Sequence, residues 1–143
     1  MSVDTNKAIV RRLFEEVYNQ RRFDVIDAIL DAEYAAFEKP WLAMLLEAFP
    51  DLHMTVEQLI GEGERVVAVI TTRGTHLGEL KGELISWLTD PLAATGRRVE
   101  VRGIFVYGIV EGKLSNADRD GLADWLTVLR QLGVATPAYD VAA

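Results

Sequence analysis

The feature that most constrains the fold is a change in the spacing of apolar residues near residue 50. Before it, apolar side chains recur every three or four residues, which is typical of amphipathic helices. After it, they alternate with polar ones in LHMTVEQLI (52–60), RVVAVITTRGTH (65–76) and RRVEVRGIFVYGIV (97–110), which predicts strands. Three helices followed by an antiparallel sheet favour an α+β fold with the helices on one side of the sheet.

The helices are predicted from apolar periodicity and from their end signals. They are expected over residues 4–20, 23–34 and 41–49. Asp4 or Thr5 can cap the first helix, and Asp24 can cap the second. The third is expected to begin at Pro40 and to be covered on most sides, because it is apolar nearly all round.

The strands are joined by short turns. GEGE (61–64) supplies the glycines of a hairpin, and EGK (111–113) leads into a fourth strand that begins at Leu114. Odd positions from Val99 to Ile109 form one apolar face of the third strand. The other face is apolar at Ile104, Val106 and Val110, so half of this strand is expected to be covered on both sides. A last helix is predicted from the spacing of five side chains: Leu122, Trp125, Leu126, Leu129 and Leu132.

A long connection, residues 77–95, separates the second and third strands. Leu80, Leu84, Trp87 and Leu88 fall at helical spacing, which predicts a short helix. Such a connection is either a lid or binding element, or a helix that closes the core. We expect one domain over residues 1–134 and a disordered tail over 135–143.

Composition excludes several functions. The 143 residues include no Cys, which excludes thiolate catalysis and cysteine metal sites. The formal net charge of −7 disfavours binding to nucleic acid or anionic lipid. No apolar run is long enough for a membrane span, and the N-terminus lacks a signal-peptide core, so a cytoplasmic protein is expected. The two His, with no acidic neighbour at ligand spacing, predict no metal site.

Several segments in order carry a family resemblance. NKAIVRRLFEEVYN, FDVIDAILDAEY, FPDLHMTVEQLIGEGERVVAVITTRGTH, ATGRRVEVRGIFVYGIVEGKL and LRQLGV together resemble the SnoaL-like polyketide cyclases of the nuclear transport factor 2-like superfamily. The resemblance covers most of residues 6–134. It implies a conical, curved antiparallel sheet with helices that close a deep apolar pocket.

The resemblance also implies an activity. Members of this family close rings in polyketide intermediates without a cofactor, by an intramolecular aldol reaction in which an Asp acts as acid and base, in antibiotic biosynthesis. A cyclase or isomerase, of the lyase or isomerase class, acting on a hydrophobic small molecule is therefore the first hypothesis. A non-catalytic small-molecule binding module on the same fold is the alternative, because fold alone does not fix function.

The resemblance assigns the catalytic acid to KLSNADRD (113–120). Asp118 is the nearest equivalent, with Asp120 next, and their spacing of two puts both on one face of a strand. Each has a structural alternative: Asp118 can be a solvated strand end, and Asp120 can cap the following helix. Asp124 is expected to be a surface or first-turn acid.

The expected pocket is unusually apolar. Ala36, Phe37, Val69 and Phe105 stand where relatives of the family often carry polar groups. The rate can then come from holding a flexible chain in a reactive shape, which includes pericyclic ring closure. Eight aromatic side chains are candidates for contacting the substrate: Tyr18, Tyr34, Trp41, Phe49, Trp87, Phe105, Tyr107 and Trp125.

Other polar residues are assigned to the surface or the rim. His53 is expected on the outer sheet face, and His76 either lines the pocket mouth or ends a strand. Arg73 and Arg102 could hold a carbonyl or anionic oxygen, although rim arginines are more often solvated. An exposed sheet face commonly pairs with a second copy, so a homodimer is expected, with a monomer as the alternative.

Overall fold

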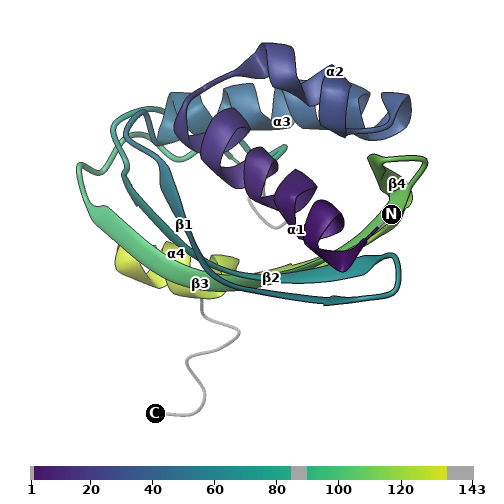
Figure 1. Ribbon diagram of the computed structural model, residues 1–143. Coiled ribbons are helices and arrows are strands. Elements are labelled where there is room, and N and C mark those ends of the chain that lie inside the picture. Colours follow the sequence, from purple (N-terminus) through teal and green to yellow (C-terminus); the bar gives the residue numbers. More distant parts are fainter. Residues whose placement is uncertain (1, 85–89, 135–143) are drawn as a thin grey trace.

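The computed structural model describes residues 2–84 and 90–134. Its sheet has four antiparallel strands in the order β1-β2-β3-β4. Their bounds are β1 His53–Glu62, β2 Arg65–Thr75, β3 Arg98–Val110 and β4 Lys113–Ala123. The sheet is strongly curved, and the helices that precede it in the chain lie over its concave face (Figure 1). The predicted α+β architecture with a curved antiparallel sheet is confirmed.

The first predicted helix is present, but its second half is a π-helix rather than an α-helix. α1 (Val3–Arg12) continues directly into the π-helical turn η1 (Leu13–Asn19), and together they lie across the concave face (Figure 1). The N-cap is Ser2, whose Oγ accepts a hydrogen bond from the Thr5 amide at 3.1 Å, so the predicted caps Asp4 and Thr5 were wrong.

The second and third predicted helices have different boundaries. A 3-10 turn (Phe23–Val25) and the short α2 (Ile26–Ile29) are followed by α3 (Ala32–Ala48). Asp31 caps α3, and the predicted cap Asp24 lies inside the 3-10 turn. Pro40 lies inside α3 rather than at its start. The helix runs through Pro40 because its buried stripe is continuous on both sides of it: Tyr34, Ala35, Glu38, Leu42, Leu45 and Ala48.

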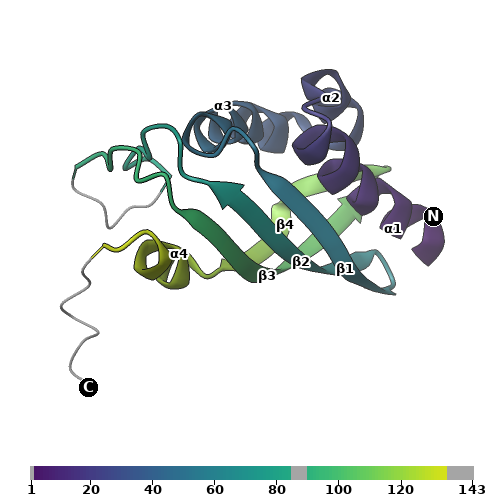
Figure 2. The ribbon, with the colours of Figure 1, turned by 90° about the vertical axis from the view of Figure 1, so that its left-hand side faces the viewer.

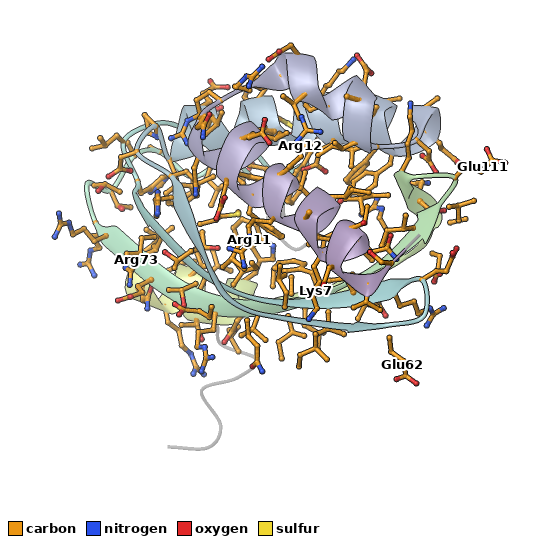
Figure 3. All side chains as sticks on the ribbon, in the orientation of Figure 1. Lys7, Arg11, Arg12, Glu62, Arg73 and Glu111 are labelled. Carbon is orange, nitrogen blue, oxygen red and sulfur yellow. The ribbon has the colours of Figure 1, made fainter. Side chains whose placement is uncertain are left out.

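Strand register separates the two faces of the sheet. Val66 pairs with Tyr107, and Tyr107 pairs with Arg119, so these three side chains lie on the concave face beneath the helices. Arg73 and Glu62 lie on the convex face and point away from the helices (Figure 3). The predicted apolar face of β3 is the concave one.

The convex face is less covered than the sequence suggested. Ile104 is 49% exposed and Val110 is 55% exposed, because no helix in the described part of the chain packs over them. The expectation that both sides of β3 are covered is therefore wrong within one copy of the chain. Ile60 on β1 and Leu122 on β4 extend this apolar surface.

The last helix begins later than predicted. β4 continues through Leu122 to Ala123, and α4 comprises Trp125–Gln131 (Figure 2). The Gln131 side chain accepts a hydrogen bond from the backbone N–H of Glu100 and donates one to its C=O, both at 2.9 Å. These two backbone groups belong to a part of β3 that does not pair with β4, so Gln131 supplies hydrogen bonds in place of a neighbouring strand.

The connection between β2 and β3 is only partly described. Leu80 pairs with Leu92 in an isolated bridge, and residues 82–84 form a turn. The second half of the predicted helix lies outside the described residues. Leu80 and Leu84 are buried, as core-closing residues would be. Trp87 and Leu88 lie outside the described residues, as does the predicted disordered tail 135–143. None of the described helices has the length and apolar character that a membrane crossing requires.

Candidate active site

An apolar cavity lies between the helices and the concave face of the sheet. Its volume is about 110 Å³, somewhat less than the ~150 Å³ of a cavity that holds benzene. Its walls come from η1, α3, the loop after α3, the strands and the start of α4: Phe14, Tyr18, Trp41, Leu45, Phe49, Leu52, Met54, Thr72, Val99, Val101, Phe105, Tyr107, Ala123, Asp124, Trp125 and Val128. Exposed Ala123 and Asp124 mark where the cavity meets the surface.

Aromatic side chains shape this cavity. Phe14 stacks on Tyr18 with ring centroids 5.8 Å apart, and meets Phe105 and Tyr107 at 6.2 Å. This group joins η1 to β3 and fixes the inner wall. At the other end, the Trp41 and Trp125 rings are nearly perpendicular, at 87° with centroids 6.4 Å apart.

A buried carboxyl stands behind the inner wall. Glu38 of α3 is only 2% exposed, and the hydroxyl of Tyr18 donates a hydrogen bond to its Oε1. Tyr18 itself lines the cavity, so it lies between the cavity and Glu38. The hydroxyl of a cavity-lining residue is therefore in direct contact with a titratable group that is shielded from water.

Burial sets the protonation of this pair. It raises the pKa of the Glu38 carboxyl, and the Tyr18 hydrogen bond and the Arg119 charge offset part of the rise. Burial, followed by the negative charge of Glu38, raises the pKa of Tyr18 well above its ordinary value. Tyr18 thus remains protonated, and the pKa of Glu38 lies above that of an ordinary glutamate.

Two further tyrosines and an arginine complete the polar cluster. Tyr34 and Tyr107 are both buried, and burial raises the pKa of each above its ordinary value. The Arg119 guanidinium lies over the Tyr34 ring, 4.2 Å from its centroid, and 4.9 Å from that of Phe37. Arg119 is also bonded to Asn116 Oδ1 at 3.1 Å. The cluster therefore combines one acid, three phenols and one cation at the inner end of the cone.

The two acids predicted as catalysts lie on the opposite side of the sheet. Asp120 pairs with Val106 on the convex face, and its Oδ1 accepts from the Gly121 amide at 2.8 Å. Asp118 also points to the convex face and forms an exposed ion pair with Arg65 at 2.6 Å. The register of β4 thus directs both carboxylates away from the cavity.

Asp124 differs from its two neighbours. It lines the cavity, and it caps α4 through Thr127, whose amide donates to Oδ1 at 3.0 Å. These contacts to Thr127 lower the pKa of Asp124. The predicted alternative of Asp120 as the helix cap was wrong, because β4 extends three residues past Asp120.

Most of the aromatic candidates meet at the cavity. Six of the eight line it: Tyr18, Trp41, Phe49, Phe105, Tyr107 and Trp125. Tyr34 is buried but does not line the cavity, and Trp87 lies outside the described residues.

The histidines and rim arginines lie away from the inner wall. His53 is exposed on the convex face, as predicted. His76 is fully buried, and its Nδ1 accepts from the Thr95 amide at 3.2 Å, which ties the ends of the 77–95 connection together. Arg73 is paired with Glu100 at 2.9 Å, and Arg102 is exposed on the convex face. In the described part of the chain, no three His, Asp or Glu side chains are grouped to hold a metal ion.

Glu38 is the residue that the sequence interpretation missed. The third helix was predicted to start at Pro40, which left EKP in a loop. The available signal is spacing: Tyr34, Glu38 and Leu42 lie four residues apart, on one helix face. A single carboxyl in an otherwise apolar helical stripe marks a buried acid, once the helix is extended through Pro40.

Comparison with known proteins defines the family. The family model described as SnoaL-like polyketide cyclase matches residues 8–132, and the chain belongs to this family. A search of curated protein sequences found no match.

Solved structures share the fold. TsrD from Streptomyces laurentii is 22% identical, with a TM-score of 0.74 and 94% and 99% of the two chains covered. A SnoaL-like polyketide cyclase from Agrobacterium tumefaciens is 20% identical, with a TM-score of 0.66 and coverage of 93% and 100%. IdmH from Streptomyces antibioticus is 20% identical, with a TM-score of 0.68 and coverage of 90% and 99%. At these identities the likeness concerns the fold.

Proposed function

We propose that this protein is a cyclase that closes a ring in a hydrophobic, polyketide-like molecule without a cofactor. The observation that carries the proposal is the contact between cavity-lining Tyr18 and buried Glu38. Membership of a polyketide cyclase family supports the same reaction class. The six aromatic wall residues are the proposed substrate contacts.

The Tyr18–Glu38 pair is suited to an intramolecular aldol closure. Ionised Glu38 takes the Tyr18 proton as the Tyr18 oxygen receives the proton that the substrate loses beside its carbonyl. The resulting enolate carbon attacks the second carbonyl and forms the new carbon–carbon bond. The same relay then returns the proton from Glu38 to the new alkoxide, so the enzyme ends in its starting state. Tyr107, which lines the same wall, is the proposed donor to the enolate oxygen.

The cavity also supports a contribution from shape. Its walls are mostly apolar, and a ligand that extends beyond about 110 Å³ has an open path at Ala123 and Asp124. Holding the two reacting carbons together in such a cavity lowers the entropic part of the barrier. This contribution applies equally to a pericyclic closure, which needs no proton transfer.

A variant that fills the cavity tests the proposal. Val101→Phe adds a ring to the sheet wall and should reduce ring closure of a linear polyketide-like substrate at least about tenfold, because the ligand loses its space. Ile104→Phe, on the convex face of the same strand, is the matched control and should retain activity. Product formation is followed by mass-resolved chromatography.

The outcomes separate the candidate functions. Equal activity of Val101→Phe and wild type would contradict a reaction in this cavity. Ligand binding by the wild-type protein, abolished by Val101→Phe but accompanied by no turnover of any substrate tested, would assign a binding module instead of an enzyme.

We further propose that the convex face pairs two copies into a homodimer. Leu122 is 76% exposed there, beside Ile104 and Val110, and burial of such side chains against a second copy is favourable. Leu122→Glu should give a monomer of 15.9 kDa by light scattering, whereas the wild type should give twice this mass. Leu77→Glu, at an exposed leucine outside the sheet, should leave the dimer intact. A wild-type mass of one chain would refute the proposal.

A further inference from the structure

The described walls of the cavity carry a single charged side chain. Asp124 borders the cavity at the surface end, and no Lys, Arg or His is among its described lining residues. Glu38 lies behind Tyr18 and does not line the space itself. Any ligand that fills the cavity therefore meets mostly aromatic and aliphatic surface, with the hydroxyl-bearing residues Tyr18, Thr72 and Tyr107 in the wall and one carboxylate at the opening.

This carboxylate is ionised and held in place. The Thr127 amide donates to its Oδ1 at 3.0 Å, and the Thr127 hydroxyl donates to its Oδ2 at 2.6 Å. Each carboxylate oxygen accepts more than one hydrogen bond, so both keep capacity for a ligand. Arg130, further along α4, is close enough to influence Asp124, but no ion pair between them is present in the described structure.

The surroundings of Asp124 favour a cation for a second reason. Trp41 and Trp125 line the same cavity as Asp124, and their rings are nearly perpendicular, at 87° with centroids 6.4 Å apart. Indole faces attract ammonium groups and repel anions through the ring quadrupole. Aromatic walls are a known way in which proteins hold an organic ammonium group, and a carboxylate adds attraction between opposite charges.

One cation lies nearby on the outer side. Arg102 lines a groove on the convex face that also reaches Asp124. Arg102 is exposed, so water and salt screen its charge, and the sheet separates it from the cavity interior. It reduces the preference for a cation but does not reverse it.

We propose that the cavity selects hydrophobic ligands that carry a positively charged nitrogen, a protonated amine or a quaternary ammonium group, at the Asp124 end. This inference rests on the proposed function, because it names the substrate class of the same cavity. The apolar body of the ligand lies among the aromatic walls, and its charged nitrogen lies between the Asp124 carboxylate and the two indoles. A matched ligand with a carboxylate at that position is rejected.

Three small ligands of similar size test the selection. Benzylammonium, benzyl alcohol and benzoate differ in charge, and their dissociation constants can be measured by NMR titration of the Trp side-chain N–H signals at low salt. Wild-type protein should bind benzylammonium about three- to tenfold more tightly than benzyl alcohol, as expected for an exposed cation site, and benzoate most weakly.

Asp124→Asn isolates the charge. Asn is also a good N-cap, so α4 should remain folded, which the circular dichroism spectrum and melting temperature would check. The variant should bind benzylammonium no more tightly than benzyl alcohol, with the alcohol itself unaffected. Asp120→Asn removes a carboxylate from the convex face of the same segment and should keep the wild-type preference.

The results distinguish this inference from the proposed function. Binding of benzyl alcohol with no preference for benzylammonium, or a preference that survives Asp124→Asn, would overturn the inference and leave the cavity as a ligand site. Failure of all three ligands to bind, or equal binding by Val101→Phe, would count against the cavity site and so against both.

Discussion

Glu38→Gln should lower the rate of ring closure by about 100- to 10,000-fold, the range typical of lost general acid–base catalysis. The amide has nearly the shape of the carboxyl and can still accept a hydrogen bond from Tyr18, but it cannot take up or return a proton. The loss should appear in kcat with little change in KM, because Glu38 lies behind the cavity wall. Steady-state kinetics with a linear substrate would measure it.

Matched variants make this result specific. Glu33→Gln alters an exposed carboxyl on the same helix and should leave kcat unchanged. Asp118→Asn and Asp120→Asn test the sequence-based assignment of the catalyst, and a large loss in either would favour it over Glu38. If the rate of Glu38→Gln is within about threefold of wild type, the proposed proton relay is contradicted, and ring closure by shape alone is favoured.

The buried carboxyl should also show in stability, independently of any substrate. Because the pKa of Glu38 is raised in the folded protein, its ionisation opposes folding. Its contribution is most favourable below the unfolded-state pKa of about 4.5 and is lost as pH rises through the folded-state pKa. The free energy of unfolding of Glu38→Gln relative to wild type should therefore increase with pH. Urea denaturation between pH 4.5 and 8 would measure this, and a constant difference would contradict it.

Phe14→Ala should reduce the free energy of unfolding by about 3–5 kcal/mol, the usual cost of removing a buried Phe side chain. Phe14 is 2% exposed and its ring contacts three other aromatic rings, so its loss separates η1 from β3. For a domain of this size the melting temperature should fall by roughly 10–15 °C. Thermal and urea denaturation would measure both quantities.

Phe37→Ala is the matched control. Phe37 is 48% exposed on α3, so its truncation should cost less than about 1 kcal/mol despite its contacts with Trp41 and Arg119. Similar losses in the two variants would show that the aromatic group around Phe14 is not the link between the helices and the sheet.

Local periodicity was sufficient for the strands and for the faces they present. Alternation in β3 placed Tyr107 and Phe105 on one face, and the register confirms that this face meets the helices. Helix ends were less predictable. Pro40 was predicted to start the third helix because proline is favoured at the first helical position. Packing of residues on both sides of it instead outweighs the cost of a proline inside α3.

The candidate site was predicted only in part. Six aromatic wall residues were identified because large aromatic side chains in a small apolar domain have few other places to go. The acids were not, because the face that a strand residue occupies depends on where the strand ends and on a register shift between β3 and β4. Moving the end of β4 past Asp120 changed the roles of all three neighbouring aspartates.

The sequence by itself determined the order of helices and strands, the apolar face of each strand, the absence of cysteine chemistry and the family. These properties depend on composition and on patterns of residues that are close together in the sequence. Only the tertiary structure decided where each carboxyl group lies relative to the cavity. Glu38 is buried behind the cavity wall, and Asp124 lies at the cavity opening, because α3, β4 and α4 meet around the cavity. Asp118 and Asp120 lie on the convex face instead, in contact with water. Charge and pKa depend on such long-range packing, which no local pattern records.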